Sequence, residues 1–253
     1  SLANGALAAQ HLAAEGARVA IVDIDVHHGN GPQSIFWNDP QVLTISIHHD
    51  PTHFFPYLTG FINETGGPAA KNCNVNVPLE EKTDGQAYEN ALDRFVFPRL
   101  EAFDPDFIVL AAGVDTYERD PMGDFSLTTE DLHRVGERVG NFGRPVTAVQ
   151  EGGYYTPHIG RNVTAVLSGV LEGYRDALEG RGIEVLSGAD AGARAGHQGS
   201  GPRVERQPRR VGHQSLGQPS EGVPTEPRSP LPRARDHHRS VGPPRRCAAA
   251  APA

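Results

Sequence analysis

Cysteine is scarce in this chain, which has only Cys73 and Cys247 among its 253 residues. One lies in the body of the chain and the other near its end, so we expect no disulfide framework of the kind that stabilises small secreted domains. No apolar run approaches the length of a membrane span, and the apolar opening residues lack the basic stretch of a signal peptide. These absences predict a cytoplasmic protein with no membrane partner.

The C-terminal segment Ser187–Ala253 lacks Phe, Tyr, Trp, Ile, Met and Lys, and it holds eleven Arg, five acidic residues and ten of the 21 Pro. Such a composition buries too little apolar surface to offset the entropy lost on ordering. We therefore predict a folded domain over residues 1–180 and a disordered tail over residues 181–253. Translation out of frame would also produce such a tail. Without aromatic residues to stack on bases, we expect no nucleic-acid partner.

Buried strands and amphipathic helices alternate through the first 180 residues. Near-continuous β-branched runs predict strands at 17–24, 42–47, 74–77, 106–112 and 145–150. Helices are expected at 4–15, at 84–102 with a bend at Pro98, at 128–141 and at 158–178. This alternation predicts an α/β fold, with a mostly parallel sheet between two layers of helices.

Polar clusters follow three of these strands. Asp23, Asp25 and His27 come at the end of the first, Asp115 follows the fourth, and Gly152-Gly153-Tyr154 follows the last. In parallel sheets, ligands bind beyond the carboxyl ends of the strands, so we expect these clusters to converge. The Gly- and Pro-rich residues 48–72 show no periodicity, and a loop of that length inside a compact domain is usually functional.

The first cluster has the spacing of a metal site. Side chains two residues apart on an extended segment point to the same side, so Asp25 and His27 can face one ion. A catalytic zinc takes about three protein ligands and keeps one position open, and Asp115 is the natural third ligand. An isolated Asp-x-His is more often a capped turn, but the combination with the later clusters favours a metal. Zinc is the leading ion, and an oxygen-rich set of this kind also suits iron(II) or manganese.

Several motifs together resemble the histone deacetylase and acetylpolyamine amidohydrolase superfamily. They are Val22-Asp-Ile-Asp-Val-His-His-Gly-Asn-Gly, Ser46-Ile-His, Phe54-Phe-Pro, Gly113-Val-Asp-Thr with Asp120-Pro-Met, and Gln150-Glu-Gly-Gly-Tyr. The resemblance runs from about residue 3 to about residue 178 and is closest to bacterial class II-like members. It implies a three-layer arginase/deacetylase-like fold and a metal-dependent amidohydrolase that releases acetate from acetylated lysine or acetylated polyamines.

The resemblance also implies roles for single residues. Asp25, His27 and Asp115 would bind Zn²⁺, and the Tyr154 hydroxyl would stabilise the oxyanion that develops on the substrate carbonyl. Gly152 and Gly153 would let the backbone bring Tyr154 close to the metal. Phe55 would line the substrate channel, although a plain core aromatic is an equally good interpretation.

Further positions match the surroundings of that centre. Asp23 would orient a catalytic histidine, and Asn30 takes the place of an acidic residue found in some subfamilies. A monovalent-cation site, for K⁺ in particular, would be formed by oxygens of Asp23, Asp25, His27, Ser46 and Ile47.

One departure from the family pattern bears on activity. Family members carry a tandem histidine pair, the general base and acid, upstream of the residue at which this chain begins. His27 is used by the metal and His48-His49 follows a different strand, so we expect a fold incomplete at its N-terminus and little or no turnover. The alternatives are a catalytically inactive metal-binding remnant and an arginase-type ureohydrolase with two manganese ions. The sequence does not indicate an oligomeric state.

Overall fold

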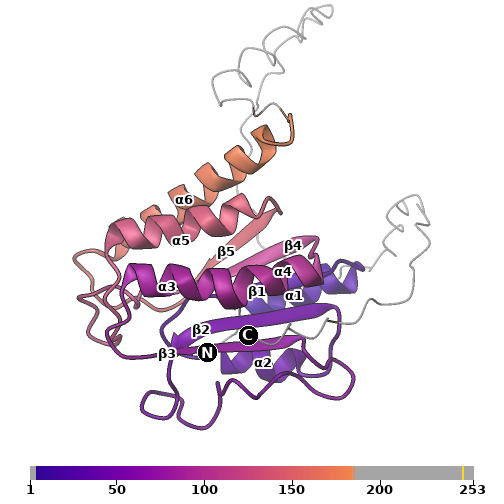
Figure 1. Cartoon of the computed structure of the whole chain (residues 1–253), viewed down its shortest axis with the longest axis horizontal. Helices are drawn as coiled ribbons and strands as arrows, with labels where there is room; N and C mark the ends of the chain where they lie inside the picture. Colours follow the sequence, from indigo (N-terminus) through magenta and orange to yellow (C-terminus); the bar gives the residue numbers. More distant parts are fainter. Residues whose placement is uncertain (1–3, 184, 186–246, 248–253) are drawn as a thin grey trace, which may run out of the picture. The chain divides into compact units, whose positions relative to one another are not determined.

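The computed structural model describes residues 4–183 together with Val185 and Cys247. Its centre is a five-stranded parallel sheet in the order β3-β2-β1-β4-β5 (Figure 1). The strands are β1 (Val19–Asp23), β2 (Val42–His49), β3 (Asn74–Leu79), β4 (Phe107–Ala112) and β5 (Val146–Gln150). The predicted parallel α/β sheet is therefore confirmed. The predicted tail lies almost entirely outside the described residues, so its disorder stays a prediction.

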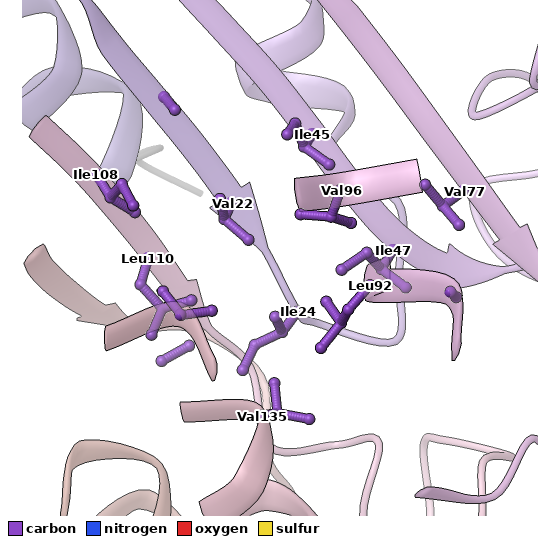
Figure 2. Close-up of a cluster of buried hydrophobic side chains, with 14 of the residues drawn as sticks. Val22, Ile24, Ile45, Ile47, Val77, Leu92, Val96, Ile108, Leu110 and Val135 are labelled. Carbon is purple, nitrogen blue, oxygen red and sulfur yellow. The ribbon is translucent and has the colours of Figure 1, made fainter. Parts of the chain in front are cut away.

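Side chains of β1 point alternately into two hydrophobic clusters, one on each face of the sheet. Val19 and Ile21 pack with the alanines of α1 (Asn4–Ala14) and with Phe36 of α2 (Asn30–Phe36). Ala20 and Val22 face the larger cluster, which the helices of the other layer complete. Figure 2 shows that cluster, in which Val22 and Ile45 of the sheet lie near Leu92 and Val96. Strands buried on both faces explain the apolar runs, and the result is the expected three-layer α/β/α arrangement.

The helix expected at 84–102 is divided into three parts. Asp84 caps the first, α3 (Gly85–Ala91), by accepting a hydrogen bond from the Ala87 amide. A π-helical turn, η1 (Leu92–Val96), leads into α4 (Phe97–Phe103), where Pro98 stands in the first turn. Because proline has no amide hydrogen to donate to the preceding turn, the regular ladder is interrupted there. The irregular turn lies just before Pro98, and the bend expected there stays a prediction.

The structure adds one helix and corrects one expectation from the sequence. Residues 30–36 form α2, a helix that the sequence did not predict; Pro32 is tolerated because it lies in the first turn of the helix. The two cysteines, which were expected to form no disulfide framework, are joined to each other, since Cys73, immediately before β3, forms a disulfide with Cys247. Their separation of 174 residues in sequence hides this pairing. By contrast, residues 50–73 contain neither helix nor strand, as expected. No described helix is both long and apolar enough to cross a membrane.

Two helices, α5 (Thr129–Asn141) and α6 (Ile159–Glu179), pack closely through glycines. The α5 helix begins with a capping box between Thr128 and Asp131. A β-carbon added at Gly136 would lie 2.2 Å from the Val166 carbonyl oxygen, and one added at Gly169 would lie 2.1 Å from the His133 carbonyl oxygen. Backbone atoms cannot move away as a flexible side chain can, so the helices lie side by side only because these positions lack side chains.

The substitution Gly169→Ala should therefore destabilise the protein. The new methyl group forces α5 and α6 apart, and overpacking of this kind costs about 1–3 kcal/mol. Gly160→Ala is the matched control in the same helix, because a β-carbon there meets nothing within 4 Å. It should be neutral or slightly stabilising, by up to about 1 kcal/mol. Urea unfolding of both variants measures the difference, and equal free energies of unfolding would contradict this packing.

Candidate metal centre

The carboxyl ends of three neighbouring strands form the site. Asp23, the last residue of β1, is in register with Ala111 of β4, and β4 is in turn paired with β5. The chain beyond each strand stays tied to its neighbour, because the Ile24 amide donates to the Ala111 carbonyl and the Val114 amide donates to the Gly152 carbonyl. Residues 24–27, 113–116 and 151–154 are thereby held together at one edge of the sheet, as predicted.

Asp25 and His27 face each other for a reason that differs from the one expected. Residues 25–27 form a bend and not an extended segment. The Asp25 amide donates to Asp23 Oδ1 at 3.0 Å, and the His27 amide donates to Asp25 Oδ1 at 2.8 Å. Each carboxylate therefore fixes the turn that follows it. The prediction that both side chains share one side is correct, but its geometric basis is wrong.

Asp25, His27 and Asp115 converge on one point. His27 Nδ1 lies 2.9 Å from Asp25 Oδ1 and 3.1 Å from Asp115 Oδ2. One oxygen or nitrogen from each of the three residues lies within 4.8 Å of the others. Asp115 is fully buried, and its second oxygen accepts a hydrogen bond from the Val26 amide at 2.8 Å. The three donor atoms are thus held by the backbone as well as by one another.

Electrostatics at this cluster demand a positive charge. Burial alone lowers the pKa of His27, but hydrogen bonds and attraction to Asp115 and Asp25 outweigh it and raise the pKa to about 10. Burial raises the pKa of Asp115 to about 7, with repulsion from Asp25 adding to the effect and the hydrogen bond to His27 opposing it. Two buried carboxylates in contact are costly unless a cation, here a protonated imidazole, lies between them.

Glycines bring the backbone against these carboxylates. The Gly152 amide donates to Asp25 Oδ2 at 2.8 Å. A β-carbon on Gly152 would lie 2.1 Å from Asp115 Oδ2, and one on Gly113 would lie 2.5 Å from the Asp25 Cα atom. No other residue type fits at these two positions without moving the cluster.

The predicted aromatic residues lie around the cluster. Tyr154 follows Gly152 by two residues, and its side chain is half exposed. Burial raises the pKa of the Tyr154 phenol, and repulsion from Asp115 and Asp25 raises it further, as expected for a hydroxyl near them. Phe55 is 59 % exposed and meets the His27 ring edge-on, with centroids 6.2 Å apart. Phe54 stacks on the same ring at 5.3 Å, so both neighbouring phenylalanines contact the imidazole.

The positions expected around the centre divide into two groups. Asp23, Ser46 and Ile47 are buried; Asp23 accepts a hydrogen bond from the Asp25 amide and is in register with Ser46, the residue before Ile47 on β2. Burial and repulsion from Asp25 raise the pKa of Asp23 well above its usual range. Asn30, by contrast, is exposed at the start of α2. It lines a separate cavity of about 580 Å³ that also includes Gln33 and Glu64, so the structure does not bring it to the cluster.

Other histidines of the described chain are engaged elsewhere. His48 is fully buried, with Nδ1 2.9 Å from Ser46 Oγ and Nε2 2.9 Å from the Gly60 carbonyl oxygen. The His28 ring lies 4.6 Å from the His48 ring, and His49 stacks on Phe54. Among the described residues, His27 is the only histidine hydrogen-bonded to Asp25 or Asp115.

One residue near the site received no role from the sequence. Asp120 is buried on the loop after β4, and its Oδ2 accepts hydrogen bonds from the amides of Tyr154 and Tyr155. Its position before Pro121, in the Asp120-Pro-Met motif, was the sign in the sequence that Asp120 has a role. The partner amides lie more than 30 residues away, so sequence spacing could not reveal them.

Comparisons with known proteins agree with these features. Residues 1–170 match the family described as the histone deacetylase domain. Acetylpolyamine amidohydrolase 1 of Pseudomonas aeruginosa is 43 % identical over 169 residues, which cover 66 % of this chain and 49 % of that protein. Histone deacetylase 8 of Arabidopsis thaliana is 37 % identical over 181 residues, which cover 68 % of this chain and 48 % of that protein.

A solved structure also resembles the fold. The crystal structure of acetylpolyamine aminohydrolase from Burkholderia pseudomallei superposes with a TM-score of 0.64 at 37 % identity, covering 69 % of this chain and 49 % of that one. The chain therefore spans about half the length of the relatives it matches.

Replacing His27 by Gln should destabilise the metal-free protein in a pH-dependent way. The pKa of His27 is about 10 in the folded state against an ordinary 6.5, so its stabilisation is complete below about pH 6.5 and is lost as the pH rises through about 10. We expect a loss of about 1.5–3 kcal/mol at pH 6 and a smaller loss at pH 9.5. Urea unfolding with a chelator present measures both values.

His133→Gln is the control for this experiment. His133 pairs with Glu172 at the surface, with 3.1 Å between Nε2 and Oε2, and exposed pairs contribute at most about 1 kcal/mol. A His27→Gln loss that is as large at pH 9.5 as at pH 6 would contradict the ion pairing described for the cluster.

Proposed function

This chain belongs to the histone deacetylase family, and from that premise we propose that it carries the metal-binding half of a zinc-dependent deacetylase. The reaction is hydrolysis of an acetamide, on acetylated lysine or an acetylated polyamine, to an amine and acetate. The observation that carries this proposal is the convergence of Asp25, His27 and Asp115 at the strand ends, with Tyr154 two residues beyond Gly152.

The donor set fits a divalent ion. Two buried carboxylates bring more negative charge than one imidazolium neutralises, and the high pKa of His27 reflects the same demand for a cation. A zinc ion bound by Asp25, His27 and Asp115 would supply Lewis-acid polarisation of the substrate carbonyl and of water. Iron(II) has compatible chemistry. Oxygens near Asp23, Ser46 and Ile47 are our candidate for a neighbouring K⁺ site.

The chain's own residues supply the remaining elements of the proposal. The Tyr154 hydroxyl keeps its proton at neutral pH, as an ordinary phenol does, and burial and the nearby carboxylates raise its pKa further. It can therefore donate a hydrogen bond to an oxyanion that forms on the substrate. Phe54 and Phe55 present apolar rings beside His27, which suits the methylene chain of a lysine or polyamine. Burial of Asp25 and Asp115 excludes water from one side of the cluster.

Slow turnover is part of the proposal. General acid and base catalysis contributes roughly 10²–10⁴-fold, and among the described residues no histidine other than His27 is hydrogen-bonded to the cluster carboxylates. Asp23 is likewise hydrogen-bonded to no imidazole in the described part of the chain. The same observation favours the second candidate, a remnant that binds metal without turnover. The two-manganese arginase-type alternative has less support, because the described residues contain a single three-residue cluster.

Metal content distinguishes these candidates. After equilibrium dialysis the full chain should hold one zinc per chain, whereas about two manganese ions would indicate an arginase-type centre. Asp115→Asn should lower zinc affinity by more than the 10- to 100-fold typical of an outer contact. Asp124→Asn is the control, since Asp124 pairs with Lys82 outside the cluster and its loss should leave zinc binding unchanged. Equal zinc affinity in both variants would overturn the assignment.

Acetate release tests the reaction itself. The zinc-loaded chain should slowly deacetylate an acetyl-lysine peptide or N-acetylputrescine, and Tyr154→Phe should lower kcat by roughly 10²–10³-fold while zinc affinity stays constant. Tyr155→Phe is the matched control, because that ring packs on Tyr117 and His158. Stoichiometric zinc binding with no release above the Asp115→Asn background would favour the remnant.

A further inference from the structure

The Asp120 carboxylate joins two loops that leave neighbouring strands. It is 7 % exposed and lies on the loop after β4. Its Oδ1 accepts the Met122 amide at 2.9 Å within that loop. Its Oδ2 accepts two amides of the loop after β5, those of Tyr154 at 2.7 Å and Tyr155 at 3.0 Å. Hydrogen bonds to a carboxylate are stronger than those between neutral groups. Asp120 therefore adds a strong polar link to the two others between these segments, from the Val114 amide to the Gly152 carbonyl and between the Tyr117 hydroxyl and His158 Nδ1.

Tyr154 depends on its backbone for its position. Its side chain is 49 % exposed, so packing restrains the ring on one side only. The two residues before it are glycines, and Gly153 has φ 143°, a conformation that other residues rarely adopt. Residues 151–155 belong to no helix or strand. Where the phenol lies is therefore decided by what holds the main chain on either side of it.

Only one of those sides is held by the cluster. Upstream, the Gly152 amide is bonded to Asp25. Downstream, the amides of Tyr154 and Tyr155 are bonded to Asp120, and the Tyr155 ring is covered by Arg119 at 4.8 Å and packs on Tyr117. Without the carboxylate, the two amides would lose their acceptor and the flexible glycine pair could redirect the phenol.

We propose that Asp120 is a positioning residue that sets the orientation of Tyr154 toward the Asp25–His27–Asp115 cluster by binding both amides of its loop. The inference rests on the proposed function for its catalytic meaning. The hydrogen bonds of Asp120 go to the Met122, Tyr154 and Tyr155 amides and not to the cluster residues, so it acts through Tyr154. An asparagine at this position keeps one acceptor oxygen and cannot serve both loops, so it should preserve only part of the effect.

Hydrogen exchange tests the positioning without relying on turnover. In the zinc-loaded full chain, Asp120→Ala should accelerate exchange of the Tyr154 and Tyr155 amides roughly 10- to 100-fold, the range expected when a hydrogen bond to a charged acceptor is lost. Asp120→Asn should give an intermediate increase. Zinc stoichiometry and affinity should stay at the wild-type values. Asp124→Ala, a carboxylate of the same loop that pairs with Lys82, should leave exchange at residues 151–158 unchanged.

Two results would overturn the inference. One is unchanged exchange at Tyr154 and Tyr155 in Asp120→Ala; the other is an increase spread over the whole chain with loss of zinc, which would make Asp120 a general support of the fold. Turnover gives a separate answer: kcat should fall in the order wild type, Asp120→Asn, Asp120→Ala, with KM nearly constant. If wild type releases no acetate, the proposed function fails while the exchange result still decides the positioning.

Discussion

Two buried carboxylates, Asp25 and Asp115, are held against each other in this protein, and the organisation of the site follows from that contact. Burial, with repulsion from Asp25, raises the pKa of Asp115 to about 7, and hydrogen bonds and attraction to the two carboxylates raise that of His27 to about 10 against the effect of burial. Like charges this close are costly in a protein interior unless a cation lies between them or one carboxyl group keeps its proton. Backbone amides of Val26 and Gly152 also donate to the pair, so the main chain helps to hold both carboxylates in place.

The parallel sheet makes this contact possible. Strands β1, β4 and β5 are adjacent and end at the same edge, although long stretches of sequence separate them. Glycines at 113 and 152 then let each loop approach the carboxylates more closely than a side chain would permit. Close packing in the helical layer relies on the same property, since α5 and α6 approach through Gly136 and Gly169. Small residues therefore define both the site and the layer that supports it.

Periodicity predicted the strands and the long helices because burial on both faces of a sheet leaves a strong apolar signal, as in Ile21 and Val22. Strand order brought Asp25, His27 and Asp115 together as expected. Periodicity did not predict the bend at residues 25–27, which local hydrogen bonds from the Asp23 and Asp25 carboxylates fix, or the short α2 helix. Nor could the pairing of Cys73 with Cys247 be predicted, because it depends on a tertiary contact. The role of Asp120 could not be predicted either, because the amides that it binds belong to another loop.

Direct observation of the metal environment tests the central claim most sharply. X-ray absorption at the zinc edge of the loaded full chain should show nitrogen and oxygen neighbours at about 2.0–2.2 Å, one of them an imidazole, with no sulfur and no second metal nearby. The spectrum should change when Asp115 is replaced by Asn and remain unchanged when Asp124 is replaced. A spectrum that does not change when Asp115 is replaced, or one with a metal neighbour at about 3.5–4 Å, would contradict a single ion held between these two carboxylates.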